Sequence, residues 1–142
     1  MAVHFYNQET DFLPKGRVKI NQWVRETIHN EGYRVGEVTY IFCSSESHLE
    51  MNRQYVGHDY FTDIITFDYC DLEGRGVVSG DIFIDPFTVE DNSRILGTDP
   101  TEELHRVIIH GILHLCGYKD KSDEEAAQMR SKEDFYLQRF PR

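Results

Sequence analysis

Hydrophobic residues recur along this chain at two spacings, one of which predicts strands and the other helices. Val38, Tyr40 and Phe42 alternate with polar neighbours, which predicts a half-buried strand, and short apolar runs predict further strands. Strands are expected at residues 3–6, 37–43, 64–69 and 80–85, and helices at residues 17–30, 45–55, 87–96, 99–115 and 123–140. The last two strands flank the glycine-containing stretch DLEGRGVVSG, so we expect them to lie side by side.

Two of the predicted helices have a clear apolar side. In the helix at 17–30, the apolar residues that indicate a buried side are Val18, Trp23, Val24 and Ile28. In the helix at 99–115, the residues at helical spacing are Leu104, Val107, Ile108, Ile112 and Leu115. This second helix also has strong end signals, because Asp99 can cap its free amides, Pro100 suits its first turn and Gly117 suits a left-handed C-terminal cap.

Length and composition place these elements in one small domain. A chain of 142 residues can bury a core but is too short to divide comfortably, so we expect a single domain over residues 1–142. Its 39% hydrophobic and 13% aromatic residues are typical of a globular protein. The fold class that follows is α+β, with a small mixed sheet of about four strands packed against about five helices.

The chain shows neither a targeting segment nor a cysteine framework. Its longest apolar runs are much shorter than the roughly 20 residues that cross a bilayer, and MAVHFYNQETDF lacks the pattern of a signal peptide. We therefore expect a cytoplasmic protein with no membrane contact. Cys43, Cys70 and Cys116 form no CxxC pair, which predicts reduced, mostly buried thiols; a reactive Cys116 is the alternative, although no basic residue adjoins it.

The formal net charge of −10 argues against binding to nucleic acid, because proteins that hold phosphates usually have net positive charge or a basic face. The N-terminal part is more basic than the rest of the chain. Its basic residues are Lys15, Arg17, Lys19, Arg25 and Arg34. These charges are typical of a solvated face, but they also leave RNA binding open.

The string HGILHLCGYKD contains a candidate metal site on a metalloprotease-like HxxxH helix. His110 and His114 are four residues apart, so a helix places both imidazoles on one side. Gly117 can then turn the chain so that Asp120 returns as a third ligand. Catalytic zinc takes three such protein ligands and keeps a fourth position for water.

Other interpretations of this string remain open. Two histidines on an apolar helix can be partly buried with backbone partners, and Asp120 can belong to the polar start of the last helix, with Ser122 or Asp123 as its N-cap. The spacing HxxxHxxGxxD also resembles that of the metzincin peptidases. Those enzymes carry a glutamate base after the first histidine, where this chain has Gly111, so peptide hydrolysis is a distant alternative.

Several segments together resemble one bacterial family. HGILHLCGYKD is similar to the signature HGxLHLxGYDH of the YbeY family, which comprises endoribonucleases and maturation factors for ribosomal RNA. MNRQYVGHDYFTDIITFDY resembles the family segment LNxxYRxKDxPTDVLSF, GDIFID resembles GDIxIS, and EEAAQMRSKEDFYL resembles the closing helix. The resemblance extends from about residue 38 to residue 139.

The chain departs from this family at two positions. Asp120 replaces the third histidine, and its carboxylate is a legitimate ligand whose harder oxygen can shift the preference away from zinc. Val56 stands where the family has an arginine implicated in RNA cleavage. Arg53 or His58 could supply a positive group on the same segment, or both could be ordinary surface residues.

Three further sets of residues have weaker signals. Thr62 and Asp63 match a Thr-Asp pair of the family and could either line a cleft or form a turn before the strand at residue 64. Gly80 and Asp81 indicate a turn entering a strand, without a catalytic role. The histidines without ligand spacing, which we expect to be structural or exposed, are His4, His29, His48 and His105.

The resemblance implies a metal-dependent endoribonuclease that cleaves single-stranded regions of ribosomal RNA, in small-subunit processing and ribosome quality control. Its cofactor would be one divalent ion, Zn²⁺, bound by His110, His114 and Asp120, and its partners ribosomal RNA and the ribosome. No small-molecule cofactor is evident, and no catalytic side chain beyond these three can be named. A ribosome-associated assembly factor with a structural metal is the alternative that Val56 favours, and a hydrolase of another substrate is the third.

Overall fold

Four strands form a mixed β-sheet in the computed structural model, which describes residues 2–57 and 62–141. The strands are β1 (Ala2–Gln8), β2 (Arg34–Cys43), β3 (Ile64–Asp68) and β4 (Val77–Ile84), and their spatial order is β1-β2-β4-β3. β1 and β4 run parallel to β2, whereas β3 pairs with β4 in antiparallel orientation. The mixed sheet and the predicted neighbourhood of its last two strands are therefore confirmed.

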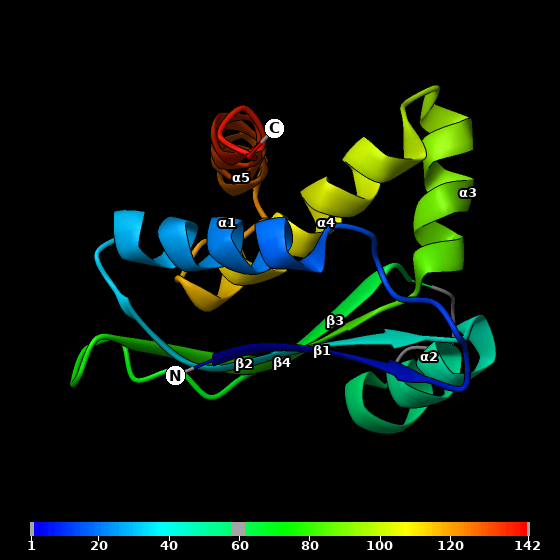
Figure 1. Ribbon diagram of the computed structural model, residues 1–142, viewed down its shortest axis with the longest axis horizontal. Coiled ribbons are helices and arrows are strands. Elements are labelled where there is room, and N and C mark those ends of the chain that lie inside the picture. The colour runs from blue at the N-terminus through cyan, green and yellow to red at the C-terminus, as the bar shows by residue number, and fades with distance from the viewer. Residues whose placement is uncertain (1, 58–61, 142) are drawn as a thin grey trace.

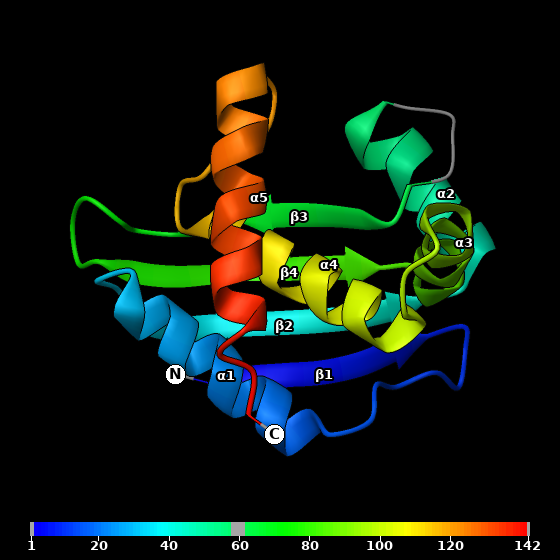
Figure 2. The same cartoon turned by 90° about the horizontal axis from the view of Figure 1, so that it is seen from above.

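Five α-helices and one π-helix accompany the sheet in the described part of the chain. They are α1 (Arg17–Asn30), α2 (Ser45–Met51), the π-helix η1 (Asn52–Val56), α3 (Pro86–Leu96), α4 (Pro100–Leu115) and α5 (Asp123–Leu137). Helices α1 and α4 lie over one face of the sheet, and α5 lies beyond them (Figure 1). The C-terminal end of α4 passes beneath α5 (Figure 2). The expected α+β fold, a small domain with one such sheet, is confirmed.

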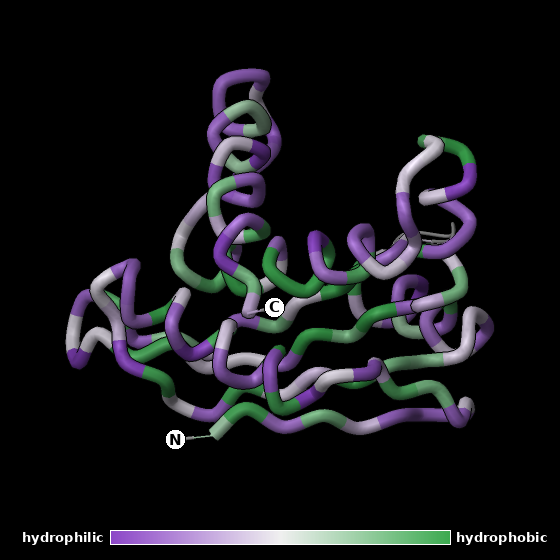
Figure 3. Tube along the Cα trace, turned by 45° about the horizontal axis from the view of Figure 1, so that its top comes forward, coloured by the Kyte–Doolittle hydropathy of each residue, from purple (hydrophilic) through white to green (hydrophobic). Residues whose placement is uncertain are grey.

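The hydrophobic core lies between the sheet and the helices that cover it. Hydrophobic stretches follow the strands and α4, while α5 is largely hydrophilic (Figure 3). Large aromatic residues in the core satisfy their polar atoms on neighbouring elements, as buried Trp and Tyr generally do. Trp23 Nε1 donates to the carbonyl of Tyr136 at 2.8 Å, and the Tyr40 hydroxyl donates to the carbonyl of Ile108 at 2.9 Å. These bonds tie α1 to α5 and the sheet to α4.

Gly80 lies inside β4, so the predicted turn at this position is wrong. A Cβ atom here would lie 2.6 Å from the Phe67 carbonyl oxygen of β3 and 2.9 Å from a methyl carbon of Leu115. The absent side chain thus lets α4 approach the β3–β4 hairpin closely. Of the predicted apolar stripe of α4, Leu115, Val107, Ile108 and Ile112 are buried, whereas Leu104 is only partly buried.

The predicted buried side of α1 contains one error. Val18 is 83% exposed, whereas Trp23, Val24 and Ile28 are fully buried together with Ile20. At about 100° per residue, Val18 lies roughly opposite Ile20 on the helix, so both cannot face the sheet. The apolar side is therefore centred on Ile20, which the prediction omitted.

Several predicted boundaries also differ from the structure. Strands β1, β2 and β4 each begin before the predicted first residue, because their backbones already pair with a neighbouring strand there. Asp85 does not end β4; its side chain accepts from Phe87 N at 3.0 Å and so caps α3. The predicted helix at 45–55 is divided into α2 and η1, and α5 ends at Leu137 rather than at residue 140.

Candidate metal centre

The C-terminal half of α4 presents two histidines on one side of the helix. His110 and His114 lie one turn apart, with ring centroids separated by 4.5 Å and ring planes nearly perpendicular. Their side chains are 21% and 27% exposed, so solvent reaches both. The residue between them that would carry a peptidase base, Gly111, faces the sheet instead, where a Cβ would lie 3.0 Å from both Ile64 and Ile82.

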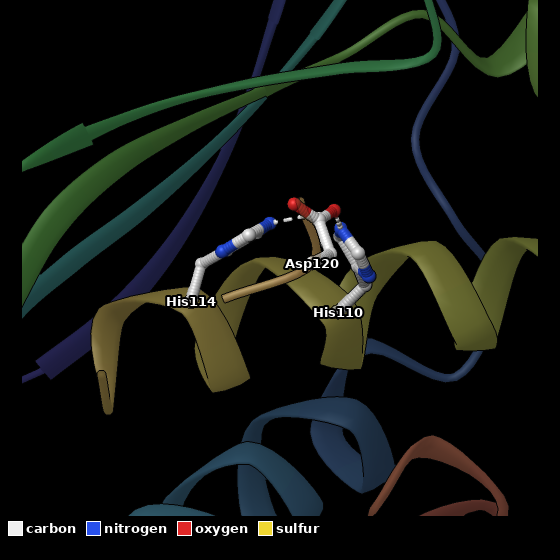
Figure 4. A group of neighbouring side chains, drawn as sticks. All are labelled: His110, His114 and Asp120. Carbon is white, nitrogen blue, oxygen red and sulfur yellow. Dashed lines mark ion pairs between the residues drawn. The ribbon is translucent and has the colours of Figure 1, made fainter. Parts of the chain in front are cut away.

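A turn after α4 returns the chain to these histidines. Gly117 has a φ of +102°, which glycine adopts readily, and its amide donates to the His114 carbonyl at 3.0 Å. Asp120 follows, and its Oδ2 lies 3.4 Å from His110 Nε2 and 3.3 Å from His114 Nε2. Figure 4 shows the Asp120 carboxylate between the two imidazoles.

Asp120 does not cap the last helix. Ser122 performs that role: its hydroxyl accepts from Glu125 N at 3.1 Å, and the Glu125 carboxylate accepts from Ser122 N at 3.0 Å. The predicted cap at Ser122 is therefore confirmed, and the Asp120 side chain faces the histidines instead of the start of α5. Among the described residues, His110, His114 and Asp120 are the one group of His, Cys, Asp or Glu that could hold a metal ion.

Each histidine uses its Nδ1 in a hydrogen bond, and that bond determines whether its Nε2 presents a lone pair to the site. His114 Nδ1 lies 2.9 Å from the Tyr118 carbonyl oxygen, which can only accept, so this nitrogen carries the proton. His110 Nδ1 lies 2.6 Å from Oε2 of Glu133 and donates to that carboxylate. In the neutral rings, both Nε2 atoms therefore direct lone pairs at the Asp120 oxygen. Three acceptors that converge in this way require a proton or a cation between them.

The spacing of the three ligand atoms fits a small tetrahedral ion. Ligand atoms roughly 2.0 to 2.2 Å from a tetrahedral zinc are about 3.3 to 3.6 Å apart. The two distances from Asp120 Oδ2, 3.4 Å to His110 Nε2 and 3.3 Å to His114 Nε2, lie in that range, and all three atoms are within 4.8 Å of one another. The donor set of two imidazoles and one carboxylate is also one that zinc accepts in catalytic sites.

Glu133 on α5 supports His110 and was missed by the sequence analysis. It is 7% exposed and is also bound by Arg106 of α4, whose Nη1 donates to its Oε1 at 2.9 Å. Burial works to raise the pKa of Glu133, but the hydrogen bonds from His110 and Arg106 hold it below its ordinary value. Burial likewise works to lower the pKa of His110, yet the hydrogen bond and charge of Glu133, with smaller contributions from Asp120 and Asp63, raise it.

A pattern in α5 could have identified Glu133. The buried residues of this helix, Met129, Glu133 and Tyr136, follow the i, i+4, i+7 spacing of an inward face. An acidic residue at an inward position indicates a buried partner, because an unpaired buried charge is unfavourable. Arg106 had no comparable signal in the sequence.

A hollow of about 180 Å³ adjoins His110 between β3, α4 and α5. The charged and titratable side chains that line it are Asp63, Glu103, Arg106, His110, Arg130 and Glu133. The lining favours the cleft interpretation of Asp63 over that of a simple turn, while Thr62 is not among the lining residues. Burial raises the pKa of Asp63 above its ordinary value, and the nearby charge of His110 opposes this effect.

The other candidate cations in the described part of the chain do not line this hollow. Arg53 Nη1 of η1 is 3.7 Å from Glu50 Oε2 of α2, Val56 is 42% exposed, and His58 lies outside the described residues. The basic residues of the N-terminal part do not line the hollow beside His110. Arg17 donates instead to the Pro14 carbonyl.

The other described histidines and the cysteines are structural or exposed, as expected. His48 is buried with its Nε2 2.9 Å from the Phe83 carbonyl oxygen, and His4, His29 and His105 lie outside the three-residue group. The cysteines are unpaired, and burial raises the pKa of each thiol to about 12. A thiol with that pKa is protonated at neutral pH, which argues against a nucleophilic Cys116.

Comparisons with known proteins match this chain to one family over nearly its whole length. The model of the family described as Endoribonuclease YbeY matches residues 5–141. Proteins named Endoribonuclease YbeY from Bacteroides fragilis and Parabacteroides distasonis are 53% and 45% identical, over 94% and 99% of this chain and 94% and 97% of their own lengths. The solution structure of TM1509 from Thermotoga maritima superposes with a TM-score of 0.66 at 28% identity, covering 96% of this chain and 87% of that one.

No helix in the described part of the chain is long and apolar enough to cross a membrane. The family match spans the site helix, the turn with Asp120 and the supporting helix α5. With relatives of about half-identical sequence over nearly the whole length, the resemblance seen in the motifs is confirmed. The chain belongs to the Endoribonuclease YbeY family.

Proposed function

We propose that this protein is a metal-dependent endoribonuclease that cleaves single-stranded regions of ribosomal RNA, with one Zn²⁺ bound by His110, His114 and Asp120. The convergence of three acceptor atoms at tetrahedral spacing, at the edge of a solvent-reached hollow, carries the metal part of the proposal. Family membership supports the endoribonuclease activity. We also propose that the protein is a single YbeY-like domain over residues 1–142, acts in the cytoplasm during small-subunit maturation and associates with the ribosome.

The chain's own residues hold the ligands in the form that binds a cation. Glu133 accepts the proton of His110 Nδ1 and the Tyr118 carbonyl accepts that of His114 Nδ1, so both Nε2 lone pairs are directed at the site. When bound there, a divalent zinc ion supplies Lewis-acid chemistry, lowering the pKa of a bound water toward about 7 and polarising a phosphoryl oxygen. The hollow beside His110 offers the scissile phosphate a place next to this site.

Cleavage after metal removal and replacement tests the proposed activity. We expect the protein with one equivalent of zinc to cut a single-stranded fragment of small-subunit ribosomal RNA, because zinc would activate the attacking water. Treatment with a chelator should abolish cutting, and added zinc should restore it. A perfectly paired duplex of the same sequence serves as the control substrate. If the zinc-bound protein cuts neither RNA, the assembly-factor alternative with a structural metal replaces this proposal.

Substitution of Asp120 tests the third ligand, which differs from the family's histidine. We expect Asp120→Ala to weaken zinc binding by at least tenfold, because only two imidazoles remain. Asp120→His should retain or tighten zinc binding, since imidazole nitrogen is a good zinc ligand. Competition titrations with a zinc indicator measure both affinities, with Asp123→Ala as the control for loss of a nearby carboxylate. Equal affinity of Asp120→Ala and wild type would exclude Asp120 from the site.

A further inference from the structure

The hollow beside His110 has to accept a polyanion in a protein of formal net charge −10. Its walls include the acidic residues Asp63, Glu103 and Glu133, which would repel phosphate. Besides the metal ion, a cationic side chain that is not already neutralised would offset this repulsion and hold the phosphate. Arg106 and Arg130 are the permanently charged cations among the described lining residues.

Arg106 already forms ion pairs with two carboxylates of α5. Its Nη1 donates to Glu133 at 2.9 Å and its Nη2 to Asp134 at 2.7 Å, and its side chain is only 14% exposed. A guanidinium held between two carboxylates adds little net attraction for a third anion. Arg106 thus organises the wall of the hollow and supports Glu133.

Arg130 is the cation that remains. It lies on α5 three residues before Glu133, so both face the same side of the helix, toward His110. Arg130 is exposed and forms no hydrogen bond or ion pair with any residue that the structure describes. Its guanidinium is therefore free to form the paired hydrogen bonds with phosphate for which this group is suited.

We infer that Arg130 binds a phosphate of the RNA strand beside the metal centre. This inference rests on the proposed function, and it names the residue that positions the substrate. Val56 on η1 brings no charge, and Arg53 is paired with Glu50, so α5 rather than η1 supplies the contact among the residues that the structure describes. The cationic residue that binds the RNA thus lies on α5, the helix whose Glu133 also holds His110.

The salt dependence of RNA binding tests this contact. The probe is a fluorescent single-stranded 2′-O-methyl RNA oligonucleotide, verified by gel to stay intact, with zinc-loaded protein in a series of salt concentrations. We expect Arg130→Ala to weaken binding roughly tenfold and to reduce the slope of log K against log salt by about 0.7, the value for one phosphate contact on a single strand. Arg130→Lys should keep the slope, because the charge is retained.

Arg139→Ala is the matched control, since it removes an arginine that follows the same helix but lines a different hollow, with Trp23 and Asn30. Its slope should equal that of wild type. Zinc content and thermal unfolding of Arg130→Ala should also match wild type, because the residue is exposed and bonds to no described group. A wild-type slope for Arg130→Ala, in a protein that binds and cuts RNA, would overturn this inference alone. A wild-type protein that binds no RNA would overturn the proposed function as well.

Discussion

His114→Ala is expected to lose both its zinc and its ability to cut RNA. The substitution removes one of three ligand atoms, the Nε2 that lies 3.3 Å from Asp120, and leaves a His–Asp pair that cannot close a zinc site. We expect less than about a tenth of an equivalent of zinc per chain and at least a hundredfold slower cleavage, since the activated water would be lost with the ion. Elemental analysis of the purified protein and gel assays of a single-stranded ribosomal RNA fragment measure the two quantities.

His29→Ala is a suitable control for the loss of an imidazole, because His29 is exposed near the end of α1 and lies outside the three-residue group. It should retain zinc and cleavage. Equal cleavage by His114→Ala and wild type would indicate a contaminating nuclease. Retention of a full equivalent of zinc by His114→Ala would show that the ion binds elsewhere in the protein.

Glu133→Gln is expected to weaken zinc binding by about ten- to a hundredfold, although residue 133 does not touch the ion. The amide keeps the shape of the side chain but removes the negative charge that accepts the proton of His110 Nδ1 at 2.6 Å. His110 Nε2 then becomes a poorer donor to a cation, and its ring is less firmly oriented. Zinc titration of both proteins measures the difference, and RNA cleavage at limiting zinc should fall in parallel.

Asp134→Asn separates this effect from the loss of an ion pair. Asp134 is the other carboxylate bound by Arg106, at 2.7 Å, and it does not contact His110. We therefore expect Asp134→Asn to retain the zinc affinity of wild type. If the two substitutions weaken zinc equally, the carboxylates act through Arg106 and the folding of α5, and the orientation of His110 is not the cause.

The residues of α4 were predictable because their signals are local. Asp99 caps the helix by accepting from Glu102 N at 3.0 Å, and Gly117 ends it with a positive φ. In a helix with these ends, the four-residue spacing places His110 and His114 on one side, and this does not depend on the rest of the fold. The return of Asp120 toward the two histidines could be stated as a hypothesis, because only a few residues separate Asp120 from the turn at Gly117.

Predictions failed where a distant segment decides the outcome. Val18 is exposed because the sheet receives the side of α1 that contains Ile20, and apolar character alone does not identify that side. Gly80 was interpreted as a turn because nothing nearby in the sequence reveals that Leu115 packs against it. In both cases the neighbour across the core, rather than the local sequence, sets the role of the residue.

The sequence by itself determined the α+β class, the site helix with its caps and the set of residues that could bind a metal. These features depend on spacings of a few residues and on the backbone preferences of Asp, Pro and Gly. Only the tertiary structure decided which groups support the site. The packing of α5 on α4 brings Glu133 to His110 across 23 residues and places Arg130 at the hollow. The spacing within α5 marks Glu133 as an inward residue, but its partner is set by the packing of one helix on another, which no local pattern encodes.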